Sequence, residues 1–198
     1  MDIIFDICGV MLEWKPDQII EKYFKNPQVI TIVKTDLLHH SDWKELDKGT
    51  ITKEDIIQRS SARTGLPIAQ IGSMITSIPG TLLPIPGTIK IIRSLKGKGH
   101  RLFILSNMPF MSIDYVEPKY PFFNLFEGKI ISCRVNMIKP DPEIYIHLLT
   151  KFNVRLESTI FIDDSDINIR AAEKLGIRSI QFINPKQCEF ELIHAGCL

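Results

Sequence analysis

The feature that most constrains the fold of this sequence is a regular alternation of helical and strand-like segments in its second half. From about residue 88 onward, amphipathic stretches typical of helices alternate with short apolar runs typical of buried strands. The expected strands span residues 101–105, 129–133, 159–162 and 179–182, and the expected helices span residues 88–98, 142–152 and 167–175. Such alternation predicts a parallel sheet with helices on both faces. We therefore expect an α/β protein with a Rossmann-like sheet.

The first half supplies one more strand and then a long helical segment. Residues 2–6 form a short apolar run that ends on Asp6, as a buried strand does. Helix signals follow from about residue 16 to residue 77, and residues 78–87 carry three prolines and two glycines that predict a hinge out of this segment. The sequence therefore predicts a core of residues 1–15 and 78–198, interrupted by an inserted helical unit of residues 16–77.

Charge, cysteine content and hydropathy exclude several classes of protein. The chain has 24 Lys and Arg against 23 Asp and Glu, so its net charge of +1 argues against a dedicated nucleic-acid binder. Its four cysteines form no C-x-x-C pair, which argues against a zinc site and a disulfide framework. No apolar run is long enough for a membrane helix, and the N-terminus lacks the pattern of a secretory signal. We expect a cytoplasmic monomer or homodimer that acts on a small molecule and binds neither nucleic acid nor membrane.

Polar residues stand where several of the expected strands end. Asp6 follows the first strand, Ser106-Asn107 the second, and Asp163-Asp164 a later one, while Lys139 lies in the segment after residues 129–133. Ligands of such sheets bind beyond the carboxyl ends of the strands. Carboxylates suit a magnesium ion, and Asp6 can also serve as a nucleophile. Each Asp alone is an ordinary turn or helix-capping residue, so the prediction depends on the whole set.

The same residues resemble the four motifs of the haloacid dehalogenase-like (HAD) hydrolase superfamily. The matching segments are Phe5-Asp6-Ile7-Cys8-Gly9-Val10-Met11, Leu105-Ser106-Asn107, Lys139-Pro140-Asp141-Pro142 and Phe161-Ile162-Asp163-Asp164, in the order of the family. Within the superfamily, the chain is similar to alpha-D-glucose-1-phosphatases and to the N-terminal phosphatase domain of soluble epoxide hydrolase. The segment 16–77 resembles the helical cap that these enzymes insert over the site.

This resemblance implies a role for each matching residue. Asp6 is expected to be the nucleophile that forms an aspartyl-phosphate, with Ser106 and Lys139 holding the phosphoryl group. Magnesium is expected to be held by Asp6, Asp163, Asp164 and the main-chain carbonyl of Cys8. The residues expected to contact substrate or phosphate are Cys8, Gly9, Asn107 and Met108. The implied function is a magnesium-dependent phosphatase of a small phosphorylated metabolite, with sugar phosphates among the candidates.

Position 8 departs from the family pattern. Most of these phosphatases have a second Asp two residues after the nucleophile, which protonates the leaving alcohol, and here the residue is Cys8. Loss of a positioned general acid typically costs about 10²–10⁴-fold in rate. From the sequence we expect a preference for phosphates with good leaving groups. Cys8 also fits a plain role as a small buried residue, and a reactive thiol is the less favoured interpretation.

Two other functions stay open at this stage. The 2-haloacid dehalogenases also lack the second Asp, but they need no metal and carry uncharged groups in place of the pair Asp163-Asp164. A catalytically weak HAD protein with a binding or regulatory role is the second alternative, and Cys8 alone supports it. Substrate choice is expected to depend on the inserted helices, where aromatic and polar residues are candidates to line a pocket or simply to pack: Trp14, His39, His40 and Trp43, together with Met108.

Overall fold

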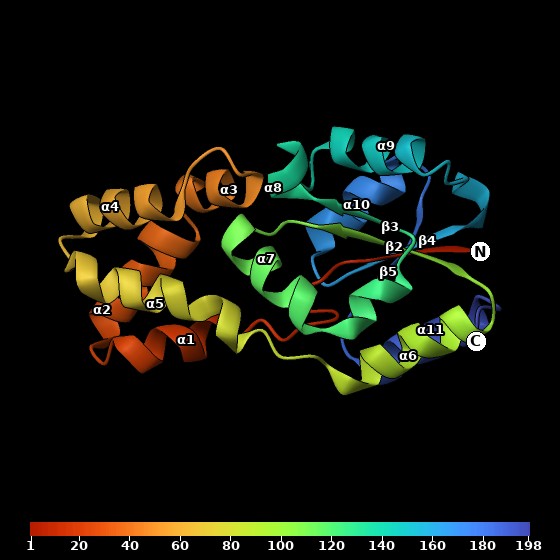
Figure 1. Cartoon of the computed structure of the whole chain (residues 1–198), viewed down its shortest axis with the longest axis horizontal. Helices are drawn as coiled ribbons and strands as arrows, with labels where there is room; N and C mark the ends of the chain where they lie inside the picture. Colours follow the sequence, from red (N-terminus) through yellow and green to blue (C-terminus); the bar gives the residue numbers. More distant parts are fainter.

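A computed structural model describes residues 1–198, and its centre is a single five-stranded sheet (Figure 1). The strands are β1 (Asp2–Phe5), β2 (Arg101–Ser106), β3 (Gly128–Ile131), β4 (Thr159–Asp163) and β5 (Arg178–Gln181). Their order across the sheet is β3-β2-β1-β4-β5, and every neighbouring pair is parallel. The predicted α/β class is therefore confirmed.

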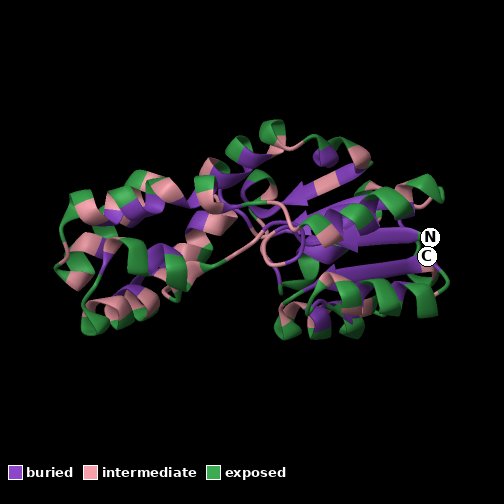
Figure 2. Ribbon diagram, turned by 90° about the horizontal axis from the view of Figure 1, so that it is seen from below, coloured by how far each residue is buried: buried purple, intermediate pink, exposed green.

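Helices cover both faces of this sheet (Figure 1). Helices α6 (Pro86–Gly97) and α11 (Pro185–His194) lie on one face, and α9 (Pro142–Lys151) and α10 (Asp166–Lys174) lie on the other. Figure 2 shows most of the sheet as buried and the outer faces of these helices as exposed, while the edge strand β5 is mostly exposed. The remaining elements of this part are α7 (Phe110–Lys119), α8 (Ser132–Val135) and the 3-10 turns η2 (Pro121–Leu125) and η3 (Leu156–Ser158).

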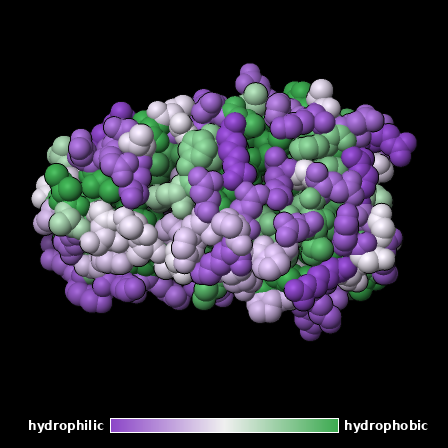
Figure 3. Space-filling view, in the orientation of Figure 1, coloured by the Kyte–Doolittle hydropathy of each residue, from purple (hydrophilic) through white to green (hydrophobic).

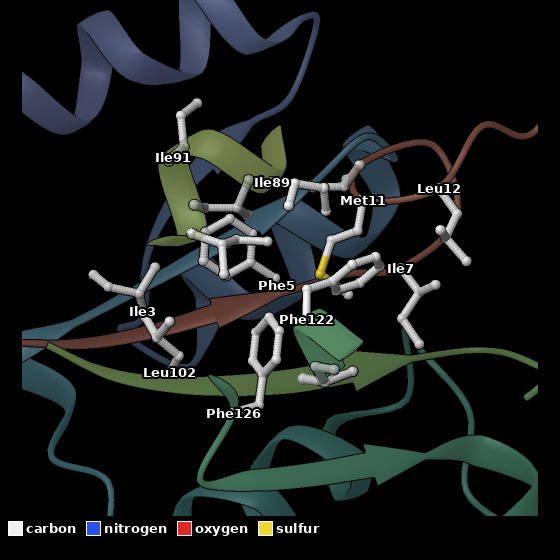
Figure 4. Packing of buried hydrophobic residues seen from close by; sticks show 14 of the residues in the cluster. Ile3, Phe5, Ile7, Met11, Leu12, Ile89, Ile91, Leu102, Phe122 and Phe126 are labelled. Carbon is white, nitrogen blue, oxygen red and sulfur yellow. The ribbon is translucent and has the colours of Figure 1, made fainter. Parts of the chain in front are cut away.

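The apolar strands are buried because both of their faces pack against helices. In β1, Ile3 and Phe5 belong to the larger core cluster, whereas Ile4 belongs to the cluster on the opposite face. Alternate side chains of a strand point to opposite faces, so a central parallel strand needs apolar residues at every position. Figure 4 shows the first of these clusters, in which Phe5 packs among residues of α6, η2 and β2.

The helices of the first half lie together at one end of the molecule, away from the sheet (Figure 1). They are α1 (Pro16–Tyr23), α2 (Pro27–Val33), the π-helical turn η1 (Lys34–Leu38), α3 (Ser41–Lys48), α4 (Lys53–Thr64) and α5 (Ile68–Thr81). A separate cluster of buried apolar residues fills their centre, including Leu37, Ile56 and Ile75. Helix α4 begins with a capping box in which the Thr52 and Asp55 side chains each bond the other's main-chain N–H.

Three local expectations need correction. The predicted hinge at residues 78–87 begins too early, because α5 continues to Thr81 and Pro79 lies inside it. The strand expected at residues 129–133 is shorter than predicted, because β3 ends at Ile131 and α8 begins at Ser132. Helices α7 and α11 were not predicted, because α7 contains Pro118 and α11 has a weak apolar pattern with Phe190 and Ile193 exposed.

The topology identifies where a ligand can bind. Chain order reverses at β1, because its neighbours β2 and β4 lead to opposite edges of the sheet. Open parallel sheets bind ligands beyond the carboxyl ends of their strands at such a reversal.

On the face seen in Figure 3, hydrophilic and hydrophobic residues are interspersed. No helix of the chain has both the length and the apolar character that crossing a membrane requires.

Candidate active site

The polar residues at the strand ends converge at this reversal. Asp6 directly follows β1, Ser106 ends β2, and Asp163 ends β4. The parallel register pairs Phe5 with Ile104 on one side and with Ile162 on the other, so the three polar residues lie at one edge of the sheet. All three are buried. The convergence expected from the order of elements is therefore present in the structure.

Lys139 lies between two of these carboxylates. Its Nζ is 3.0 Å from Asp6 Oδ1 and 2.5 Å from Asp163 Oδ2, and it donates to the main-chain oxygen of Leu105 at 2.9 Å. The Lys139 side chain is 1% exposed, so its charge depends on these partners. Burial alone would lower the pKa of this ammonium. The charges of Asp6 and Asp163 raise the pKa by more than burial lowers it, so the net effect is an elevated pKa. Lys139 is therefore a cation at neutral pH.

Asn107 contacts Lys139 rather than standing free in the site. Its Nδ2 donates to the Lys139 carbonyl oxygen and its Oδ1 accepts from the Lys139 main-chain N–H, both at 2.8 Å. This pair of hydrogen bonds fixes the segment between α8 and α9 against the end of β2. Asn107 also lines the cavity described below.

Asp163 is held from several directions. Its Oδ1 accepts from the Ser165 main-chain N–H at 2.8 Å and from Asn168 Nδ2 at 3.0 Å, while Oδ2 pairs with Lys139. Such hydrogen bonds fix the orientation of a carboxylate that is a candidate metal ligand.

Gly9 is required by the approach of Asp164. Its φ is +78°, which side chains rarely adopt, and a Cβ atom at this position would lie 2.2 Å from Asp164 Oδ2. The glycine therefore lets the loop after β1 turn tightly beneath the Asp164 carboxylate. The expected contact of Gly9 with substrate or phosphate stays a prediction, and the structure shows its steric role beside the acidic cluster.

Asp6, Asp163 and Asp164 form the acidic cluster of the site. One carboxylate oxygen from each lies within 4.8 Å of the other two, with Asp6 and Asp163 buried and Asp164 exposed. Burial raises the pKa of Asp6 to about 7; the Lys139 charge opposes this shift, and the charges of Asp163 and Asp164 add to it. Three carboxylates face one ammonium here, and hard oxygen ligands around an excess of negative charge fit a divalent cation such as magnesium.

Ser106 presents a free hydroxyl to the site. Its side chain is fully buried, and its Oγ lies beside the Asp6 carboxylate without making a hydrogen bond of full geometry to any protein group. Buried hydroxyls are usually paired, so an unpaired one at the edge of a site fits a ligand oxygen. Cys8 and Met108 complete the set of expected residues, and both line the adjoining cavity.

This cavity lies between the sheet and the helices of the first half. Its volume is about 110 Å³, and it is lined by Cys8, Asn107, Met108, Pro109 and Ser112 from the sheet side and by Trp14, Trp43, Asp47, Ile78 and Leu82 from the other. The rings of Trp14 and Trp43 lie 6.4 Å apart. His39 and His40 do not line it, and His40 Nδ1 instead accepts from the Asp42 N–H at the start of α3.

Asp47 is the one carboxylate among the lining residues, and sequence reasoning missed it. It lies in the last turn of α3, where the negative end of the helix dipole disfavours a carboxylate. That unfavourable placement, directly before the helix-ending Lys48-Gly49, was the one signal in the sequence that could have drawn attention to it.

The parallel sheet and the carboxylates at its strand ends define a Rossmann-like α/β protein with a candidate metal centre. The profile of the haloacid dehalogenase-like hydrolases matches residues 3–176, and the chain belongs to this family. It is 28% identical over 174 residues to the sesquiterpene phosphatase astK of Aspergillus oryzae, covering 88% of this chain and 85% of that protein. It is 21% identical over 187 residues to a D-ribitol-5-phosphate phosphatase of Bacteroides thetaiotaomicron, covering 91% and 90%.

Solved structures share the fold. The crystal structure of an HAD family enzyme from Bacteroides thetaiotaomicron, in complex with magnesium and inorganic phosphate, aligns with a TM-score of 0.71 at 24% identity. The alignment covers 92% of this chain and 94% of that one. At this identity the likeness concerns the fold alone.

Proposed function

We propose that this chain is a magnesium-dependent phosphatase that hydrolyses a small phosphate monoester through an aspartyl-phosphate on Asp6. The observation that carries the proposal is the cluster of three carboxylates, two of them paired with Lys139, next to the buried hydroxyl of Ser106. The carboxylates need a cation, and the ammonium and hydroxyl suit the oxygens of a phosphoryl group. The phosphatases among the relatives support the same activity.

In the proposed reaction, the Asp6 carboxylate attacks phosphorus and the bond to the leaving oxygen breaks. Lys139 and Ser106 hold the phosphoryl oxygens, while the charge of Lys139 opposes the rise in the pKa of Asp6 that burial causes. Asp6, Asp163, Asp164 and the carbonyl of Cys8 would hold magnesium, which would supply positive charge to neutralise the phosphoryl oxygens. Water then attacks phosphorus, the bond to Asp6 breaks, and inorganic phosphate leaves.

The cavity favours an apolar alcohol as the other half of the substrate. Its walls include Trp14, Trp43, Ile78, Leu82 and Met108, and no Lys or Arg lines it. Substrates with a second phosphate or a carboxylate would find no cation there, and a sugar would find polar side chains only in Asp47, Asn107 and Ser112. The name of the sesquiterpene phosphatase relative points in the same direction. We propose an alkyl or prenyl monophosphate as substrate, with residues 16–77 acting as the cap that selects it.

Phosphate release from p-nitrophenyl phosphate tests the activity. The wild type should be active with magnesium and inactive with a chelator, and Asp6→Asn should lose about 10³-fold or more. The matched control is Asp166→Asn, which removes an exposed acid whose partner is Arg170 on the same helix. Chelator-resistant chloride release from a 2-chloroalkanoate, without phosphate release, would instead identify a dehalogenase.

A substrate panel tests the class of alcohol. It should contain dimethylallyl and geranyl phosphates, ribitol 5-phosphate and glucose 1-phosphate, compared by kcat/KM. The apolar esters should lead, and widening the cavity wall with Trp43→Ala should change kcat/KM for these esters more than for p-nitrophenyl phosphate. A higher kcat/KM for the polyols would contradict the assignment.

A further inference from the structure

The proposed reaction leaves one proton without a source. The leaving alkoxide must be protonated, and the position that usually carries a carboxyl group for this is Cys8. Cys8 carries a thiol in place of that carboxyl group, and a thiol is intrinsically the weaker acid, with an ordinary pKa of about 8.5 against about 3.9 for Asp. Such a thiol is a poor acid at neutral pH, so another group must be sought on the side of the leaving alcohol.

Asp47 is the one carboxyl group that faces Cys8 across the cavity. It comes from α3 in the cap and lines the cavity together with Cys8, Asn107 and Met108. Its side chain is half-buried and makes no hydrogen bond or ion pair with any protein group, including the acidic cluster. An unpaired carboxyl group among apolar walls is costly unless a ligand uses it.

The end of α3 is fixed to the core, so the position of Asp47 is defined. Ser132 of α8 donates its hydroxyl to the Asp47 carbonyl oxygen and accepts from the Met108 N–H at 2.9 Å. Asn136 Nδ2 donates to the Lys48 carbonyl oxygen at 3.0 Å. Gly49 has a φ of +78°, and a Cβ there would lie 2.7 Å from the Cys133 carbonyl oxygen. These contacts fix the end of α3 and the loop at Met108 relative to each other beside the cavity.

From this placement we propose that Asp47 is the general acid and base of the reaction, supplying from the cap the function that Cys8 lacks. The inference rests on the proposed phosphatase function. In the first step the bond from phosphorus to the leaving oxygen breaks, the Asp6–phosphorus bond forms, and the Asp47 proton passes to the leaving oxygen. In the second step Asp47 accepts a proton from water, whose oxygen bonds to phosphorus as the bond to Asp6 breaks. Asp47 ends protonated, as it began.

The electrostatics of Asp47 agree with such a role. Burial raises its pKa to about 8, the charge of Asp6 adds to the shift, and Lys139 opposes it. The groups that face it are Asp6 after β1, Cys8 in the following loop, Lys139, and Cys133 of α8. Its place at the C-terminal end of α3 further favours the neutral form.

The decisive experiment measures how kcat/KM depends on the leaving group. Wild type and Asp47→Asn are compared on 2,4-dinitrophenyl, p-nitrophenyl, phenyl and alkyl phosphates, with magnesium. Asp47→Asn should lose about 10²–10⁴-fold on the alkyl ester and less than about tenfold on the dinitrophenyl ester, which needs no proton. Glu54→Gln, an exposed cap acid, is the matched control and should match the wild type on every ester.

A second readout does not depend on turnover. Beryllium fluoride with magnesium mimics the phosphoryl group on Asp6 and has no leaving alcohol, so Asp47→Asn should bind it as the wild type does. Binding is followed by the fluorescence of Trp14 and Trp43, which line the cavity. Loss of this binding in Asp47→Asn would mean that the residue supports the site structurally, and would overturn the inference.

The remaining outcomes separate the two proposals. An equal loss on all four esters would overturn the role of Asp47 while leaving the phosphatase intact. If the loss of the carboxyl group at position 8 is not compensated, kcat/KM of the wild type should depend steeply on the pKa of the leaving group. Such a dependence in the wild type would overturn the role of Asp47 without any variant. A wild type that neither releases phosphate nor binds beryllium fluoride would reject the phosphatase itself.

Discussion

The side-chain amide of Asn107 forms two hydrogen bonds of 2.8 Å with the main chain of Lys139, one as donor and one as acceptor. Asn107 lies just after β2, and Lys139 lies more than thirty residues later, between α8 and α9. The amide therefore joins two segments that each contribute to the site. Its own polar atoms are occupied by this contact, which makes Asn107 a positioning residue for the Lys139 ammonium.

Asn107→Ala should therefore weaken catalysis through Lys139. We expect kcat to fall by about 10–100-fold, as for other residues that orient a site from outside it. Because two buried groups lose their partners, the free energy of unfolding should fall by about 1–3 kcal/mol. Steady-state kinetics and urea unfolding measure the two effects. Asn124→Ala, an exposed asparagine in η2, should alter neither, and an unchanged kcat in Asn107→Ala would remove this role.

Gly9→Ala should lower the affinity for magnesium. Its new methyl group would collide with the Asp164 carboxylate, 2.2 Å away, and displace it from the cluster. The left-handed backbone adds about 1–3 kcal/mol of strain. Gly65→Ala is a matched control, since Gly65 has a φ of +71° and no heavy atom near its Cβ position. Magnesium titration by calorimetry should show at least a tenfold loss for Gly9→Ala only; equal affinity in both variants would contradict the contact.

Lys139→Met should destabilise the metal-free protein. Removal of the ammonium leaves Asp6 and Asp163 facing each other in a buried site, which should cost about 3–5 kcal/mol in the free energy of unfolding. The loss should be smaller at pH 5, where Asp6 is protonated, and magnesium should restore part of the stability. Chemical unfolding at pH 5 and pH 8, with and without magnesium, measures this. A loss that is independent of pH and metal would indicate a simple packing defect.

The stability conferred by magnesium should depend on pH. The pKa of Asp6 is raised from its unfolded value of 3.8 to about 7, so the folded metal-free protein binds an extra proton between these values. The stabilising contribution of Asp6 is thus present at low pH and lost as the pH rises through about 7. Magnesium needs the ionised carboxylate, so its affinity should increase up to that pH and then level off.

Thermal unfolding across pH 5 to 8 tests this relation. Without metal, Asp6→Asn should gain stability relative to the wild type as the pH rises, because the amide carries no charge. With saturating magnesium, the thermal stability of the wild type should instead rise relative to that of Asp6→Asn as the pH increases from 5 to 8. Parallel curves under both conditions would mean that Asp6 is neither perturbed nor a metal ligand.

Much of the sheet was predictable because its strands are short apolar runs bounded by glycines and by polar ends. The segments predicted at 101–105 and 159–162 correspond to β2 and β4 within one residue. The positions of Asp6, Ser106 and Asp163 followed from the rule that parallel strands end at one edge. Their roles as nucleophile, phosphate contact and metal ligand stay predictions.

Other features depend on tertiary contacts that no local pattern encodes. The expected contact of Asn107 with substrate or phosphate stays a prediction, whereas its hydrogen bonds to the main chain of Lys139, thirty-two positions away, had no signal in the sequence. Asp47 lies on α3, whose charged sequence resembles an ordinary solvated surface, and only the docking of α3 on α8 brings it to the cavity. Helix α11 was missed because half of its apolar residues stay exposed.

The most direct test of the central claim is acid-quench mass spectrometry of the enzyme during turnover of p-nitrophenyl phosphate with magnesium. The peptide containing Asp6 should gain the mass of one phosphoryl group in the wild type, and this gain should be absent from Asp6→Asn and from samples with chelator. Efficient phosphate release with no phosphorylated Asp6 peptide at any quench time, or a phosphoryl group on a different residue, would contradict the account.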